Sequence, residues 1–137
     1  MASTTKRQSI VPPPFQALYQ AFHFSPATRV GDTIWVSGQV GLDAEMKPAG
    51  GMQEQARLAF EALKAVLESA GASLDDVVEL TTFHTDLRRD IAVFTAVKDK
   101  YIAQPFPSWT AVGVTELALP ELCIEIRAVA VAGCGKT

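Results

Sequence analysis

The sequence predicts a single α+β domain in which a mixed β-sheet carries two helices on one face. Strand-like and helical segments follow one another in the order strand, strand, helix, strand, helix, strand, strand. Strands that are separated by helices need crossover connections, so the sheet is expected to be mixed. The chain has 137 residues, which is the length of one domain.

The first part of the chain is expected to be an extended arm that is mobile or laid on a surface. Residues 1–14 are mostly polar and end in three prolines, which favour an extended backbone. We expect the domain to cover residues 15–132 and a short tail to follow at 133–137. The segment 15–24 is apolar and aromatic without clean periodicity, so it could be a first strand or an irregular packed segment.

The first clear strand and the first helix come next. A Gly-Asp turn precedes the β-branched and aromatic run Thr33–Ser37, which predicts a strand that ends at Gly38. Residues 41–51 contain Gly, Pro and Asp and predict a loop. A helix follows, with Gly71 placed to end it in the left-handed conformation. Its apolar residues form one stripe at three- and four-residue spacings: Ala56, Ala59, Phe60, Leu63, Val66, Leu67 and Ala70.

The second half of the chain repeats this alternation. Val77–Thr85 is rich in β-branched residues and predicts a strand, and the polar residues 86–90 begin a second helix. Prolines within 104–107 end that helix. Two further strands are expected at 109–117 and 122–132. One face of the second helix consists of Ile91, Phe94, Val97, Lys98 and Tyr101.

The last strand is apolar on both faces, which bears on assembly. One face carries Leu122, Ile124, Ile126, Ala128 and Ala130, and the other carries Cys123, Val129 and Val131. Two helices cannot easily cover both faces of a sheet, so the second face must meet another surface. A symmetric homo-oligomer is the simpler solution, and a monomer that closes its sheet into a partial barrel is the alternative.

Composition and charge exclude several classes of function. Hydrophobic residues make up 48% of the chain and charged residues 20%, as in a globular domain. The net charge is −3, so nucleic acid is not an expected partner. Neither a membrane-spanning window nor a signal peptide is recognisable, so we expect a cytoplasmic protein without a membrane partner. The two cysteines lack metal-ligand spacing, and neither a metal nor a cofactor is expected.

Glu125 is the most informative carboxylate. It alternates with Ile124 and Ile126 in an apolar strand, on the face expected to meet another subunit, where a charge needs a partner. Glu125 could form a salt bridge with Arg127 or with an arginine of a neighbouring subunit. Alternatively, its pKa could be shifted so that it handles a proton or holds a water molecule. His84 is expected to be solvent-facing or capped.

Five ordered motifs resemble the Rid family, also called YjgF/YER057c/UK114, which consists of small trimeric enamine and imine deaminases. The motifs are Arg29–Gln39 with its Ser-Gly-Gln turn, Leu67–Val78 with its Ala-Gly-Ala-Ser helix end, Phe83–Leu87, Phe106–Val114 and Ile124–Ile126. The resemblance implies a chorismate-mutase-like fold and a homotrimer whose sheets line a central β-barrel. It also implies small-molecule clefts between subunits, in which enamines and imines such as 2-aminoacrylate are hydrolysed to keto acids and ammonia.

The resemblance also assigns roles to individual residues. Glu125 matches a glutamate that orients water, and Gly38 matches the glycine of the Ser-Gly-Gln turn. Phe24 falls where the family has a tyrosine in the cleft, and Arg89 falls near a frequent asparagine position. With Glu125 as the catalytic carboxylate, the implied substrate-binding residues are Phe24, Ser37, Gly38, Arg89, Trp109 and Ala111.

Trp109 stands where the family has an arginine that grips the substrate carboxylate. The indole N–H of tryptophan offers one neutral hydrogen-bond donor, whereas the guanidinium of arginine offers several charged donors in a planar arrangement. Each lost hydrogen bond to a charged group weakens binding of a 2-imino acid by roughly 1.5–3 kcal/mol, so efficient 2-aminoacrylate turnover is not expected. Arg89 or Arg127 could restore the charge, or the natural ligand could lack a carboxylate and stack on Trp109 and Phe24.

Two functions therefore stay open. The first is a homotrimeric hydrolase that acts on an imine, an enamine or a related small molecule, in a divergent branch of the Rid family. The second is a non-catalytic trimer that binds a small molecule in the same cleft. An old family label, ribonuclease or translation inhibitor, is disfavoured by the acidic net charge and by the lack of a residue pair suited to phosphodiester cleavage.

Overall fold

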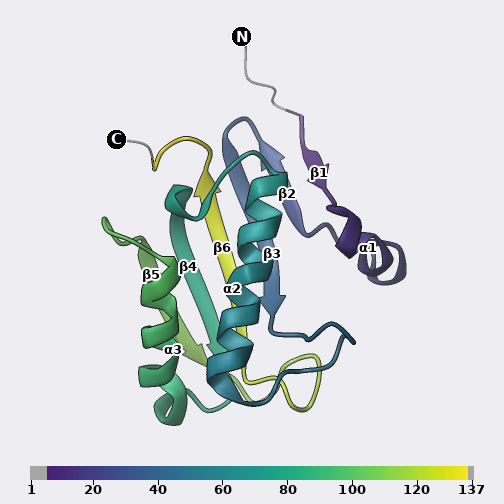
Figure 1. Ribbon diagram of the computed structural model, residues 1–137. Helices are drawn as coiled ribbons and strands as arrows, with labels where there is room; N and C mark the ends of the chain where they lie inside the picture. The colour runs from purple at the N-terminus through teal and green to yellow at the C-terminus, as the bar shows by residue number, and fades with distance from the viewer. Residues whose placement is uncertain (1–5, 136–137) are drawn as a thin grey trace.

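Six strands form one mixed sheet in the order β1-β2-β3-β6-β4-β5, in a computed structural model that describes residues 6–135. The strands are β1 (Gln8–Ile10), β2 (Ala27–Val30), β3 (Thr33–Val40), β4 (Val77–His84), β5 (Ser108–Gly113) and β6 (Ile124–Val131). The helices are α1 (Gln16–Phe22), α2 (Gly51–Ser69) and α3 (Leu87–Tyr101), with single 3-10 turns at Pro13–Phe15 and Leu74–Asp76. Figure 1 shows α2 and α3 lying side by side across one face of the sheet.

The topology confirms the mixed α+β prediction. From β2 to β6 the elements follow the predicted order, and β4 runs parallel to β5 after the crossover through α3. The other neighbouring strands of the described sheet are antiparallel. β1 and β5 are its two edges, so residues 6–135 of one copy do not close the sheet into a barrel.

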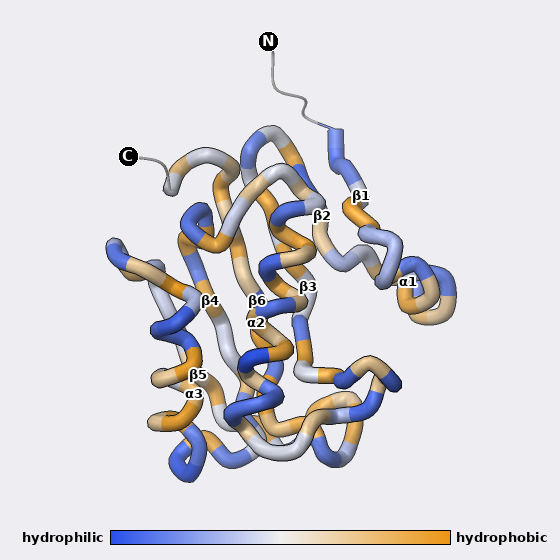
Figure 2. Tube along the Cα trace, in the orientation of Figure 1, coloured by the Kyte–Doolittle hydropathy of each residue, from blue (hydrophilic) through white to orange (hydrophobic). Residues whose placement is uncertain are grey.

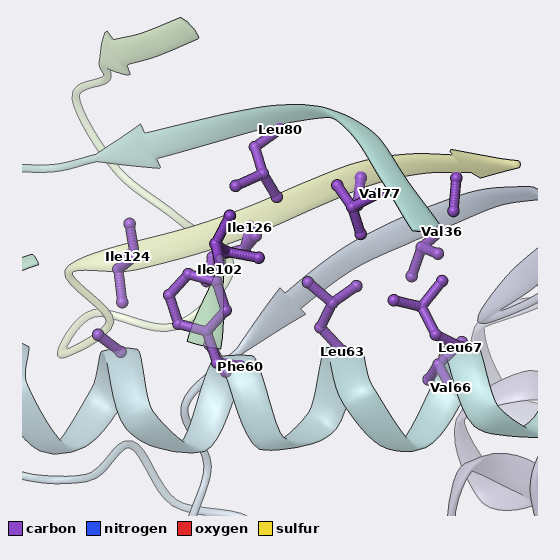
Figure 3. Packing of buried hydrophobic residues seen from close by; sticks show 14 of the residues in the cluster. Val36, Phe60, Leu63, Val66, Leu67, Val77, Leu80, Ile102, Ile124 and Ile126 are labelled. Carbon is purple, nitrogen blue, oxygen red and sulfur yellow. The ribbon is translucent and has the colours of Figure 1, made fainter. Parts of the chain in front are cut away.

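Helix α2 supplies much of the apolar core. Figure 2 shows apolar and polar residues alternating along this helix. Phe60, Leu63 and Leu67 have no exposed surface. In Figure 3 they lie between the helix and the sheet, near Val36 and Ile126. Burying each such side chain stabilises the fold by about 1.5–3 kcal/mol, which explains why the periodic stripe predicted this helix well.

The end of α2 also follows the sequence prediction. Gly71 has a φ of +87°, the left-handed conformation that terminates a helix with little strain in glycine. The amide of Ala72 donates to the carbonyl of Leu67 at 2.9 Å. Arg29 of β2 donates through Nη1 to the carbonyl of Ala70 at 2.6 Å. The helix end is therefore tied to the neighbouring strand.

Three segments differ from the sequence prediction. Residues 15–24 are neither a strand nor irregular, because α1 follows a 3-10 turn that starts with two prolines and ends at His23, where φ is 58°. Within the expected arm 1–14, Gln8–Ile10 pairs with β2 as an edge strand. β5 ends at Gly113 rather than at 117, because its partner β4 ends at His84, opposite Gly113.

The two faces of the sheet have different surroundings. Ile124, Ile126, Ala128 and Ala130 of β6 are buried beneath the helices, as the alternation predicts. Their neighbours Glu125, Arg127, Val129 and Val131 are half-buried on the other side, which we call the open face. Trp35 of β3, opposite Val129, is 41% exposed there. The open face therefore combines apolar side chains with a half-buried carboxylate.

Candidate functional site

Glu125 lies at the beginning of β6 on the open face. Its cross-strand partners are Val40 of β3 and Phe83 of β4, both of which are apolar. These neighbours cannot replace the water that a carboxylate loses when it is half-buried. Burial accordingly raises the pKa of Glu125 above its ordinary value.

Gly38 makes room for the Glu125 side chain. The pairing of β3 with β6 shifts between Val36 and Gln39, and Gly38 lies within this irregularity. A Cβ atom at Gly38 would lie 2.5 Å from Cδ of Glu125 and nearer still to its Oε2, well inside van der Waals contact. The carboxylate can therefore occupy this position only beside a glycine.

Ser37 is anchored to the segment that precedes β2. Its hydroxyl donates to the carbonyl of Ser25 at 2.6 Å, and its amide donates to the carbonyl of Pro26 at 2.9 Å. Phe24 adjoins this segment, is 39% exposed and lines a surface pocket of about 290 Å³ together with residues of α1. These bonds connect the segment carrying Phe24 to the irregularity beside Glu125.

Arg127 does not neutralise Glu125 within one copy of the chain. It lies on the open face two positions along β6, but its Nη1 is 3.9 Å from Oε1 of Glu79. Within residues 6–135 no cation forms an ion pair with Glu125, so the proposed internal salt bridge with Arg127 is wrong. In the sheet register Arg127 pairs with Thr81 of β4, and Glu79 lies diagonally across from it, two positions along the same strand.

Trp109 lies on the opposite face of the sheet from Glu125. It pairs with Leu80 of β4, which is buried beneath the helices. The centroid of its indole is 5.9 Å from that of Phe94 in α3, and its Nε1 donates to Oγ1 of Thr82 at 2.9 Å. The indole is thus built into the layer between β5 and α3.

Thr82 links Trp109 to a buried histidine that the sequence analysis misplaced. The Thr82 hydroxyl accepts a hydrogen bond from the indole and shares a second hydrogen bond, of 2.8 Å, with Nε2 of His84. His84 has no exposed surface, and its Nδ1 has no hydrogen-bond partner in the described part of the chain. Burial lowers the pKa of His84. The expected solvent-facing histidine is wrong, because the two-residue alternation of β4 places it with Leu80.

Lys98 lies near Trp109 as well, although the sequence analysis did not choose it as a site residue. The residue is only 8% exposed, and its Nζ lies 4.9 Å from the ring centroid of Trp109 and 5.8 Å from that of Phe106. The same ammonium donates to Asp99 at 3.1 Å. A lysine within the apolar face of the predicted helix was the available signal.

Arg89 and Ala111 lie on the same side of the sheet as Trp109, the side that the helices cover. Arg89 lies near the start of α3, where its guanidinium is 3.2 Å from a carboxylate oxygen of Asp86 and 2.8 Å from one of Asp90. The hydrogen bonds and charge of Asp90 are the main reason that the pKa of Arg89 is raised. Ala111 lies on the same face as Trp109, opposite Thr82, and offers only a methyl group. The charge of Arg89 is therefore balanced within the chain.

Comparison with known proteins identifies the family. The family model described as Endoribonuclease L-PSP matches residues 15–132, which is most of the chain. The chain belongs to the endoribonuclease L-PSP family. The resemblance to the Rid family that the motifs indicated is thereby confirmed.

Relatives within the L-PSP family cover most of the chain. RutC family protein YjgH of Escherichia coli K12 is 42% identical over 114 residues, which cover 82% of this chain and 87% of the relative. The 2-iminobutanoate/2-iminopropanoate deaminase of Mus musculus is 33% identical over 135 residues, or 96% and 90% of the two chains. The structure of Rv2704 from Mycobacterium tuberculosis, a YjgF/YER057c/UK114 family member, has a TM-score of 0.81 at 28% identity and covers 93% and 100%.

In this L-PSP family member, the expected site residues fall into two groups. The Glu125 group consists of Phe24, Ser37, Gly38 and Glu125, and the Trp109 group consists of Arg89, Trp109 and Ala111 together with Thr82, His84 and Lys98. Sheet register places Glu125 on the open face and Trp109 beneath the helices. One copy of the chain therefore does not bring the two groups together.

Two other types of site can be assessed in the same L-PSP family chain. Across residues 6–135, no group of three or more His, Cys, Asp and Glu side chains is arranged to hold a metal ion. None of the helices in this range is both long and apolar enough to cross a lipid bilayer.

Proposed function

We propose that this protein is a hydrolase that deaminates a small imine or enamine. The observation that carries the proposal is the Glu125 carboxylate, which is half-buried among apolar neighbours without a cation and fits only beside Gly38. The reaction is R₂C=NH + H₂O → R₂C=O + NH₃, and an enamine enters it after tautomerising to the imine. Neither a metal nor a cofactor takes part in this proposal.

Glu125 has the properties of a proton-transfer group. Because its pKa is raised, its carboxylate accepts a proton from water more readily than an ordinary glutamate does. The water oxygen then bonds to the imine carbon, and the proton passes through Glu125 to the imine nitrogen, which gives a carbinolamine. The hydroxyl proton of this intermediate then passes to the amino group as the C–N bond breaks, so that the carbonyl forms and ammonia leaves. General acid–base catalysis of this type accelerates a reaction by about 10²–10⁴-fold.

Assembly of the complete site would need more than one copy of the chain. Glu125 and Trp109 lie on opposite faces of one sheet, so both can border one cleft only when they come from different copies. The open face has exposed apolar residues such as Trp35 that favour burial against another copy. We therefore propose a homotrimer in which the open faces surround a central barrel and small molecules bind between subunits.

A coupled assay tests the proposed activity. Amino acid and amine oxidases would generate a set of imines in situ, and ammonia release would be followed with and without the protein. We expect a rate above the uncatalysed one, and a loss of about 10²-fold or more in Glu125→Gln. Glu79→Gln is the matched control, because Glu79 is an exposed carboxylate on the same face that pairs with Arg127. A Glu125→Gln variant as active as the parent would refute the role of Glu125.

A non-catalytic binding protein is the second candidate function. The observation that favours it is the internal pairing of the Trp109 group, in which the indole donates to Thr82 and Arg89 is held by two aspartates. Such a cleft has few polar groups with which to orient a reacting substrate. Saturable binding of a small molecule without turnover of any imine would support this function over the hydrolase.

A ribonuclease function, which the family description names, is not proposed for this chain. The net charge of −3 gives no electrostatic attraction for a polyanion. We expect no RNA binding in filter assays at any salt concentration, whereas binding that weakens steeply with salt would contradict this expectation. The expected partner is a small molecule in the cytoplasm.

A further inference from the structure

The contacts around Trp109 bear on the chemical class of the substrate, and the inference drawn from them rests on the proposed function. We infer that the Trp109 side of the cleft takes an uncharged, apolar group. The preferred substrate is then an imine or enamine that carries no carboxylate on its imine carbon. Three features of the Trp109 group carry this inference.

The first feature is that the indole N–H is already used. Trp109 has a single polar hydrogen, and Nε1 donates it to Thr82 at 2.9 Å. Thr82 is fully buried and is also hydrogen-bonded to Nε2 of His84, which is fully buried too. Turning the indole toward a ligand would break its bond to the buried Thr82 hydroxyl, so Trp109 offers a ligand its ring and not its donor.

The second feature is that the nearby cations have their own counterions. Arg89 is held by Asp86 and Asp90, at 3.2 and 2.8 Å. Lys98 is 8% exposed and donates to Asp99 at 3.1 Å while its ammonium lies over the Trp109 ring. The charge of each cation is thus already offset by an aspartate, so a ligand carboxylate gains less from either cation than from an unpaired one.

The third feature is the apolar character of the remaining surface. Ala111 contributes a methyl group on the face of Trp109, and the Phe106 ring beside Lys98 is 61% exposed. A carboxylate placed here gives up hydration without a charged donor to replace it. An uncharged alkyl or aryl group instead gains contact with aromatic rings.

A matched pair of ligands tests the inference by binding rather than by turnover. Acetophenone and benzoylformate are the ketone products of two imines, and they differ in a methyl group replaced by a carboxylate. In NMR titrations we expect acetophenone to bind at least about tenfold more tightly. The inference would be overturned if benzoylformate bound as tightly as acetophenone or more tightly. It would also be overturned if neither compound bound. Acetophenone binding without turnover of its imine would uphold the inference and contradict the hydrolase function alone.

Three variants trace the preference to the Trp109 group. Trp109→Arg should raise the affinity for benzoylformate about tenfold or more and lower that for acetophenone, because it adds a charged fork. Trp109→Phe should keep the preference for acetophenone, because it removes an N–H that no ligand uses. Lys98→Met should keep the preference for acetophenone, and a loss of benzoylformate binding in this variant would identify Lys98 as an anion anchor and overturn the inference. Thermal unfolding checks that each variant is folded. If a variant does not fold, the comparison of acetophenone and benzoylformate binding to the parent protein decides the inference.

Discussion

At the scale of single residues, Gly38 and Glu125 depend on each other. Gly38→Ala places a Cβ against the outer atoms of the flexible Glu125 side chain, which can turn away, so the loss of stability should stay below the roughly 1–3 kcal/mol of overpacking in a rigid core. We expect this loss in urea unfolding, together with reduced imine hydrolysis because the carboxylate is displaced. Gly50→Ala is the control, since a Cβ there would meet nothing within 4 Å.

A double variant tests whether the contact itself is the cause. Glu125→Ala removes the atoms that a Cβ at Gly38 would meet, so Gly38→Ala should destabilise the Glu125→Ala background much less than it destabilises the parent. An equal cost of Gly38→Ala in both backgrounds would mean that the backbone of the β3 irregularity, rather than the Glu125 contact, requires glycine at this position.

The raised pKa of Glu125 predicts a stability gain when its charge is removed. The unfolded chain ionises this group near its ordinary value of 4.5, while the folded chain keeps it protonated to higher pH. Between these two values the folded state binds more protons, so the free energy of unfolding falls as pH rises through that window. Glu125→Gln should therefore be more stable than the parent at neutral pH and close to it below pH 4.5. Urea unfolding across this pH range measures the difference, and a variant less stable at neutral pH would contradict the prediction.

At the scale of elements, Gln55 of α2 holds two connections at the end of the sheet where Glu125 lies. Its Nε2 donates to the carbonyls of Ala49 and Glu121 at 2.8 and 2.9 Å, and its Oε1 accepts from the amide of Cys123 at 2.9 Å. Gln55 is only 2% exposed, so solvent cannot replace these bonds without rearrangement.

Replacing this glutamine should loosen both connections. Gln55→Ala is expected to lower the free energy of unfolding by about 1.5–4.5 kcal/mol, from three hydrogen bonds of about 0.5–1.5 kcal/mol each. Gln53→Ala, an exposed position in the same helix, is the matched control and should change stability little. Hydrogen exchange should show faster opening at Ala49 and Cys123 in Gln55→Ala alone. Equal stability of the two variants would contradict the role assigned to Gln55.

Elements with a strong local pattern were predictable from the sequence, and those decided by distant partners were not. The α2 stripe and Gly71 follow from packing and backbone preferences along one segment. Helix α1 buries none of its residues, so no periodic pattern marked it. The end of β5 depends on where β4 stops, which is a property of another strand.

The same reasoning applies to the candidate site. Resemblance to a family supplied Glu125 and Trp109, but their placement on opposite faces follows from sheet register, which the sequence does not state. Thr82 and His84 could have been found from alternation with Leu80 on β4. The hydrogen bond from the indole to Thr82 could not have been predicted from the sequence, because it joins residues on two different strands.

At the scale of the whole molecule, the open face predicts the assembly. We expect the parent to sediment at three times the 14.7 kDa mass of the chain. Trp35→Glu places a charge on the face expected to be buried between copies, so it should shift the protein toward single chains and lower activity. Val93→Glu is the control, because Val93 is 43% exposed on α3 rather than on the open face. A parent that sediments as a single chain would contradict the proposed trimer.

The division of the two groups between opposite faces of one sheet also has a genetic consequence. In the proposed trimer, each cleft would join the Glu125 group of one copy to the Trp109 group of its neighbour. A gene copy that has lost only Glu125 and another that has lost only the Trp109 side would each encode an inactive protein. Expressed together, they would form mixed trimers in which some clefts receive an intact group from each copy. Two defective alleles would then complement each other, which no site confined to one chain allows.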